Sequence, residues 1–180
     1  MIPSVIFAQE TRDLDAHEHG HSTLNIAVEG MQVAMELEAP GADIVGFEYE
    51  ATTSEDRAKL AVAIAELSKP LSLFVLPAAA GCTVVESKAG LIGEDHAENE
   101  EHEEHSDEEH AKEKGAGHTE FHAEYLLTCT DPSAINRIKF AFFETFPNAK
   151  EVDVQIISDK GSQGFEVDRG APVLDLSGLI

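Results

Sequence analysis

Alternating apolar and polar residues dominate the first part of the chain. Residues 21–28 alternate between aliphatic and polar or small side chains, and residues 31–37 alternate again. Glu29-Gly30 between the two runs is a turn signal, and Pro40 ends the second run. Period-two alternation on both sides of a tight turn is typical of a β-hairpin, which we predict here.

Shorter apolar or alternating runs predict further strands. They lie at 44–49, 71–76, 82–87, 118–129, 152–157, 165–167 and 173–176. Side chains of an extended chain point alternately to its two faces. One face of 118–129 therefore carries Phe121, Ala123, Tyr125 and Leu127, and the other carries His118, Glu120, His122 and Glu124.

Two segments have helical spacing instead. The first starts at Thr52, with Glu55 at capping-box spacing, and ends near residue 68. The second starts at Asp131-Pro132 and has apolar residues at helical spacing, namely Ile135, Ile138, Phe142 and Phe146. We therefore predict an α+β fold, with a largely antiparallel sheet, two amphipathic helices and the insert described next.

Charge separates an insert from the body of the chain. The formal net charge is -23, from 35 Asp and Glu against 12 Lys and Arg. Segment 94–117 contributes -9 of this charge, and it has no apolar side chain larger than Ala. It cannot bury apolar surface, so we expect a disordered His/Glu-rich loop within a single domain, 13–180. Residues 1–12 are predicted to be a disordered N-terminus or the remnant of a signal peptide, since a short apolar run ends at Ala8.

The acidic composition and the missing motifs exclude several classes of function. A chain this acidic has no basic face for nucleic acid or for an anionic membrane surface. No apolar run reaches the roughly 18 residues of a membrane span. A GxSxG nucleophile motif and a glycine-rich phosphate loop are also missing.

The two cysteines, Cys82 and Cys129, both lie in predicted strands and not in a CxxC pair. We interpret them as a disulfide between neighbouring strands; two separately buried thiols are the alternative. A loop of this length would gain about 4 kcal/mol from closure. A disulfide would indicate the periplasm or the cell exterior, because thiols stay reduced in the cytoplasm.

The histidines carry the candidate chemistry. His17, His19 and His21 project from one side of an extended chain, about 6.5–7 Å apart in succession. His118 and His122 repeat this arrangement with Glu120 between them. If the two strands were neighbours, five imidazoles and one carboxylate would face each other. A single histidine of this kind is usually a solvated polar side chain, but clustered imidazoles with carboxylates suit Zn²⁺, and in vitro also Ni²⁺, Cu²⁺ or Co²⁺.

The insert adds a second set of histidines. These are His96, His102, His105 and His110, all within a carboxylate-rich tract. Tracts of this composition bind borderline metals weakly and in several copies, so we predict secondary metal sites here. The alternative is a loop that only increases solubility.

Several runs resemble the ZrgA-like family of zinc-regulated periplasmic zinc-binding proteins of Gram-negative bacteria. The resemblance lies in LDAHEHG at 14–20, LNIAVEG at 24–30, GFE at 46–48, the His-rich insert, and FP at 146–147 followed by VDVQ at 152–155. It implies a non-enzymatic periplasmic protein that assists zinc acquisition alongside an ABC transporter. Two alternatives remain: a zinc-dependent hydrolase, with Glu120 or Glu48 as general base, and a structural or adhesion module with incidental histidines.

Overall fold

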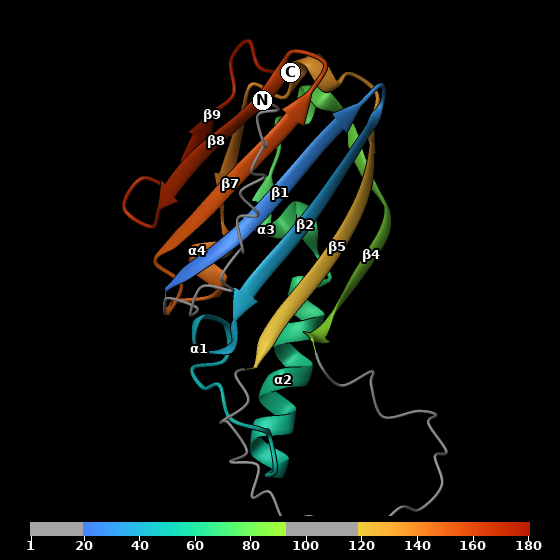
Figure 1. Cartoon of the computed structure of the whole chain (residues 1–180). Helices are drawn as coiled ribbons and strands as arrows, with labels where there is room; N and C mark the ends of the chain where they lie inside the picture. The colour runs from blue at the N-terminus through green and yellow to red at the C-terminus, as the bar shows by residue number, and fades with distance from the viewer. Residues whose placement is uncertain (1–19, 93–118) are drawn as a thin grey trace, which may run out of the picture.

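The structure, a computed structural model, describes residues 20–92 and 119–180 (Figure 1). Its strands are β1 (His21–Glu29), β2 (Gln32–Pro40), β3 (Phe74–Val75), β4 (Cys82–Ile92), β5 (Glu120–Cys129), β6 (Arg137–Phe140), β7 (Glu151–Ser158), β8 (Gly161–Asp168) and β9 (Val173–Asp175). Its helices are α1 (Gly41–Ile44), α2 (Ser54–Leu67), α3 (Pro70–Leu73) and α4 (Phe142–Thr145), with two 3₁₀ turns, η1 (Ala78–Ala80) and η2 (Pro132–Ala134).

A six-stranded sheet forms one layer of the molecule. Its strand order is β4-β5-β2-β1-β7-β8, and a second sheet has the order β3-β6-β9. In the large sheet β1 and β7 are parallel, whereas the other neighbours are antiparallel. Figure 1 shows the helices behind one face of this sheet. The sheet is thus mixed and mostly antiparallel, close to the prediction.

The core fills the space between the large sheet and the layer behind it. Alternate residues of β1, β2, β5 and β7 point inward and are buried: Leu24, Ile26, Val33, Met35, Leu37, Phe121, Ala123, Tyr125, Leu127, Val152, Val154 and Ile156. The hydroxyl of Tyr125 donates to the carbonyl of Leu67 over 2.8 Å, which joins β5 to the end of α2. Burial raises the pKa of this Tyr125 hydroxyl.

The predicted hairpin is confirmed, and so is the face pattern of 118–129 over the part that the structure describes as strand, 120–129. Strands β1 and β2 pair from Glu29 opposite Gln32 onward, around a two-residue loop. Gly30 in that loop has a φ of 57°, a left-handed conformation that glycine adopts without steric cost. On β5 the four apolar residues are buried, and the acidic and histidine positions lie on the opposite face.

The prediction of two amphipathic helices is not confirmed. The first helix exists as α2, but its cap is Thr53, whose side chain accepts from the N–H of Asp56, one residue later than predicted. The second does not form as one helix, because the predicted segment divides into the 3₁₀ turn η2, strand β6 and the short helix α4. Its centre is strand β6, which pairs with β3 and β9. Ile138 and Phe140 are buried at period two, as in a strand. As a strand, the segment also forms sheet hydrogen bonds with β3 on one edge and β9 on the other.

Two shorter strand predictions are also corrected. No strand forms at 44–49, because α1 ends there and Gly46 has a φ of 83°, which breaks an extended run. In 71–76 the chain first makes the helical turn α3, with Pro70 at its start, and only Phe74–Val75 is extended. The predicted disorder of 1–12 and of 94–117 falls outside the described residues.

The predicted disulfide is confirmed. Cys82 and Cys129 are bonded and stand directly opposite each other on β4 and β5. Cys129 is fully buried, and the bond ties the edge strand β4 to the sheet. Among the helices of residues 20–92 and 119–180, none is long and apolar enough to cross a bilayer.

Candidate metal centre

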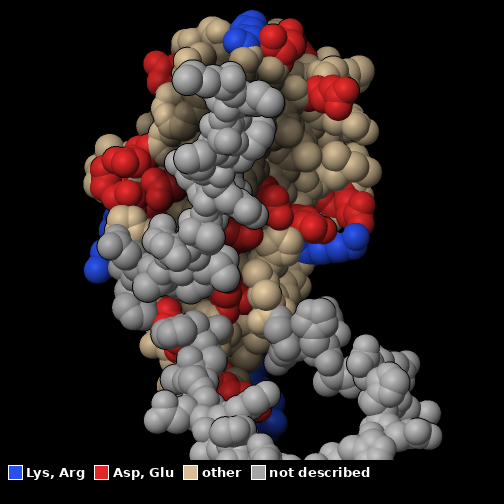
Figure 2. Space-filling view, viewed as in Figure 1, with Lys and Arg blue, Asp and Glu red and all other residues tan. Residues whose placement is uncertain are grey.

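The outer face of the six-stranded sheet carries acidic side chains. They are Glu36, Glu38, Glu120, Glu124, Glu151, Asp153, Glu166 and Asp168. Figure 2 views this face and shows carboxylates distributed across it. They alternate along the same strands with the buried core residues.

Three pairs of carboxylates on this face stand directly opposite each other. Glu36 faces Glu124 across β2 and β5, and β7 and β8 place Glu151 opposite Asp168 and Asp153 opposite Glu166. Like charges at directly opposed positions destabilise a sheet. A bound cation would remove this repulsion, so the face is electrostatically suited to attract metal ions.

The first cluster, which we name the β1–β7 group, consists of His21, Glu151 and Asp153. His21 is directly opposite Glu151 in the parallel pair, and Asp153 lies two residues further along the same face. Nδ1 of His21 is 3.3 Å from Oε1 of Glu151. One ligand atom from each of the three residues lies within 4.8 Å of the others, close enough to share one ion.

A buried carboxylate fixes the start of β1 and therefore the position of His21. Asp43 is 2 % exposed and accepts a hydrogen bond from the N–H of Gly20 at 2.8 Å. The hydroxyl of Ser22 donates to the other oxygen of Asp43 at 3.4 Å. The carbonyl of Gly20 in turn accepts from the N–H groups of Lys150 and Glu151. These bonds fix the first residues of β1 and β7 beside each other.

The second cluster, the β2–β5 group, consists of Glu36, Glu38 and His122. His122 is directly opposite Glu38, and its Nε2 is 3.0 Å from Oε1 of Glu36. Again one ligand atom from each residue lies within 4.8 Å of the others. The hydroxyl of Thr23 on β1 donates to Oε2 of Glu38 at 3.4 Å and so supports that carboxylate from the opposite side.

The sequence had suggested one shared cluster of strand histidines, on the condition that their strands are neighbours. That condition is not met, because β2 lies between β1 and β5. His21 and His122 consequently belong to separate groups, each completed by carboxylates of a different neighbouring strand. Glu120 shares the outer face of β5 with His122 but is in neither group.

The remaining predicted ligands lie outside the described residues. They are His17, His19, His118, His96, His102, His105 and His110. The carboxylate partners from β2 and β7, by contrast, are not predicted by the sequence alone. Their signal is present as alternating acids in MELE at 35–38 and EVDV at 151–154, but only strand order reveals which histidine each pair meets.

Each group offers one imidazole and two carboxylates. Such mixed nitrogen and oxygen ligands suit Zn²⁺ and other borderline divalent cations. Three protein ligands also leave a fourth coordination position for water or for another side chain. The groups are partly exposed, with side-chain exposures of 39 % for His21 and 28 % for His122, so an ion can enter from solvent.

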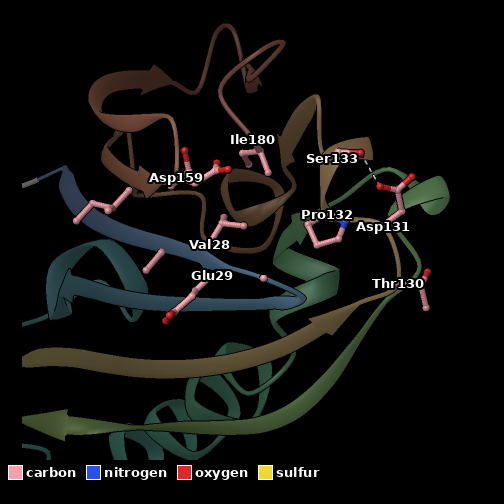
Figure 3. A pocket seen from close by; sticks show the side chains of 12 residues that line it. Val28, Glu29, Thr130, Asp131, Pro132, Ser133, Asp159 and Ile180 are labelled. Carbon is pink, nitrogen blue, oxygen red and sulfur yellow. Dashed lines mark hydrogen bonds between the residues drawn. The ribbon is translucent and has the colours of Figure 1, made fainter.

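A separate cavity of about 600 Å³ lies at the hairpin end of the sheet (Figure 3). Among the described residues its lining includes Glu29, Asp131 and Asp159 and no histidine. The Ser133 hydroxyl donates a hydrogen bond of 2.6 Å to one carboxylate oxygen of Asp131. β1 begins at His21 and reaches this cavity only at its other end, so we assign the cavity no part in metal binding.

Comparison with known proteins agrees with the resemblance noted in the sequence. No curated protein matches the chain. A family model described as "ZrgA family zinc uptake protein" matches residues 16–176, which include both groups, both cysteines and the acidic insert. The chain therefore belongs to the ZrgA family of zinc uptake proteins.

Proposed function

We propose that this protein is a periplasmic zinc-binding protein that assists zinc acquisition. The observation that carries the proposal is the β1–β7 group, in which an imidazole and two carboxylates converge on one point of an acidic sheet face. Membership of a zinc uptake family supports the same conclusion. Zinc is the cargo here, and Ni²⁺, Cu²⁺ or Co²⁺ are expected to bind in vitro.

In this proposal the folded domain binds zinc tightly and the insert binds it weakly. His17 and His19 precede His21 in the sequence, and we propose them as further ligands at the same end of β1. His118 and Glu120 have the corresponding place before His122. The insert histidines, His96, His102, His105 and His110, supply secondary sites that raise the local zinc concentration.

The disulfide supports the periplasmic location. Cys82 and Cys129 are bridged, and structural disulfides persist in oxidising compartments. From this location the protein would deliver zinc to a component of a zinc ABC transporter. We propose that it acts by binding and release without turnover. A chelator-sensitive hydrolysis of esters or phosphoesters would contradict this and favour the zinc hydrolase.

Calorimetric titration of the metal-free full-length protein with Zn²⁺ tests the proposal. We expect a high-affinity phase, followed by weaker phases from the insert. In the double variant His21→Gln, Asp153→Asn, the dissociation constant of the high-affinity phase should rise by more than about tenfold. Asp159→Asn removes one carboxylate in the distant β7–β8 turn and is the matched control, for which we expect no change.

The contrary results are equally definite. If the wild-type protein binds no zinc, the proposed function is wrong. If the double variant retains the high-affinity phase unchanged, the protein binds zinc but the β1–β7 group is not its site.

A further inference from the structure

We propose that Glu36, Glu38 and His122 form a second divalent-cation site, separate from the β1–β7 group and open to solvent. The inference rests on the proposed function, since it assumes that the sheet face binds zinc. It goes further by assigning two ions to the folded domain and by naming the ligands of the second one.

The ligand atoms of the β2–β5 group already converge before any ion binds. Nε2 of His122 is 3.0 Å from Oε1 of Glu36, and one ligand atom of Glu38 lies within 4.8 Å of both. All three residues stand on hydrogen-bonded strands in fixed register. An ion would therefore bind without the loss of backbone freedom that a flexible site pays on binding.

Among the described residues, His122 is the basic side chain that pairs with the carboxylates of this group, and no lysine or arginine does so. None of the ion pairs formed within 20–92 and 119–180 joins Glu36 or Glu38 to a lysine or arginine. Lys88 is nearby on β4, but its Nζ is 2.7 Å from Glu86. Glu36 also faces Glu124, whose other cross-strand neighbour is Lys88 on β4. A bound cation would pair with both carboxylates and reduce the repulsion between Glu36 and Glu124.

Gly90 leaves one side of the site open. It is the residue of β4 directly opposite His122, on the side away from Glu38. A Cβ built at Gly90 would meet no atom within 4 Å. Water can therefore complete the coordination of an ion held by three protein ligands, and metal can enter or leave from this side.

Strand order separates the second site from the first. The β2–β5 group uses the two strands on one side of β1, and the β1–β7 group uses the neighbour on the other side. His122 and His21 lie on strands two positions apart, which amounts to about 10 Å across the sheet. The two groups have no residue in common, and the ligand atoms of each lie within 4.8 Å of one another, so we assign each group its own ion.

Histidine side-chain NMR of the full-length, metal-free protein distinguishes this site from all others. The ¹H–¹⁵N signals of His122 and His21 are assigned by their loss in His122→Gln and His21→Gln. During titration with Zn²⁺ alone, we expect the ring nitrogens of both residues to shift. In Glu36→Gln, Glu38→Gln, the zinc concentration that half-shifts His122 should rise by more than about tenfold, while that for His21 is unchanged.

Glu29→Gln is the matched control, because it removes one carboxylate at the hairpin end of β1. We expect it to leave both titrations unchanged. If His122 stays unshifted at zinc concentrations that saturate His21, the second site is wrong although the proposed function stands. If Glu36→Gln, Glu38→Gln weakens both titrations equally, the groups share one site, and the inference is likewise overturned. If neither histidine shifts, the β1–β7 group and the second site are both wrong as zinc sites.

Discussion

The two faces of the six-stranded sheet are made from alternate residues of the same strands, but they differ in what they contribute. The inner face of β1, β2, β5 and β7 is aliphatic and aromatic and is almost fully buried. The outer face of the same strands places carboxylates opposite carboxylates. The comparison shows that stability is concentrated on one face, while the other accepts unfavourable charge pairs that a metal ion can relieve.

The largest expected effect comes from the inner face. Phe121 on β5 is fully buried, and Phe121→Ala should lower the free energy of unfolding by about 3–5 kcal/mol because it leaves a cavity in the core. Urea denaturation of the metal-free protein measures this. Glu124→Ala, an outward position of the same strand, is the control and should change stability by less than about 1 kcal/mol, the size of a like-charge pair. Similar losses for the two variants would refute the contrast between the faces.

The second effect concerns the edge strand β4, which has neither a fully buried face nor a face of opposed carboxylates. None of its side chains is fully buried. It is held by its ladder with β5, by the disulfide, by a hydrogen bond from the Ser87 hydroxyl to the carbonyl of Ser68 and by the partly buried Ala89 and Leu91. Replacing Cys82 and Cys129 together by Ala should lower the free energy of unfolding by about 2–4 kcal/mol, since the bond closes a loop in the unfolded chain. Thermal unfolding of the double variant beside the wild-type protein measures the loss. An unchanged midpoint would mean that the disulfide adds nothing to the stability of the fold.

The smallest effect tests the outer face. Glu166 is exposed on β8 and faces Asp153, so Glu166→Gln removes one like-charge pair. Without metal, we expect the free energy of unfolding to rise by about 0.2–1 kcal/mol. Added salt should stabilise the wild-type protein in the same direction, because it screens these charges. A lower free energy of unfolding in Glu166→Gln would show that this acidic pair does not destabilise the fold.

Local patterns predicted the parts of the fold that depend on neighbouring residues. The β1–β2 hairpin follows from alternation around one glycine turn, and α2 follows from a capping threonine and helical spacing. Prediction failed at 131–146, where Ile138 fits both a helical and a strand period. Pairing with β3 and β9, which come from distant parts of the chain, decides for the strand.

The sequence by itself determined the chemical character of this protein: its acidity, its histidine pairs, its disulfide partners and the outward position of His21 and His122. These follow from composition and from period-two alternation, which are properties of single strands. Only the tertiary structure decided which groups meet. By inserting β2 between β1 and β5 and pairing β1 with β7, it separates the two histidines and gives each its own carboxylates. Strand order depends on long-range pairing across the whole core, and no local pattern encodes it.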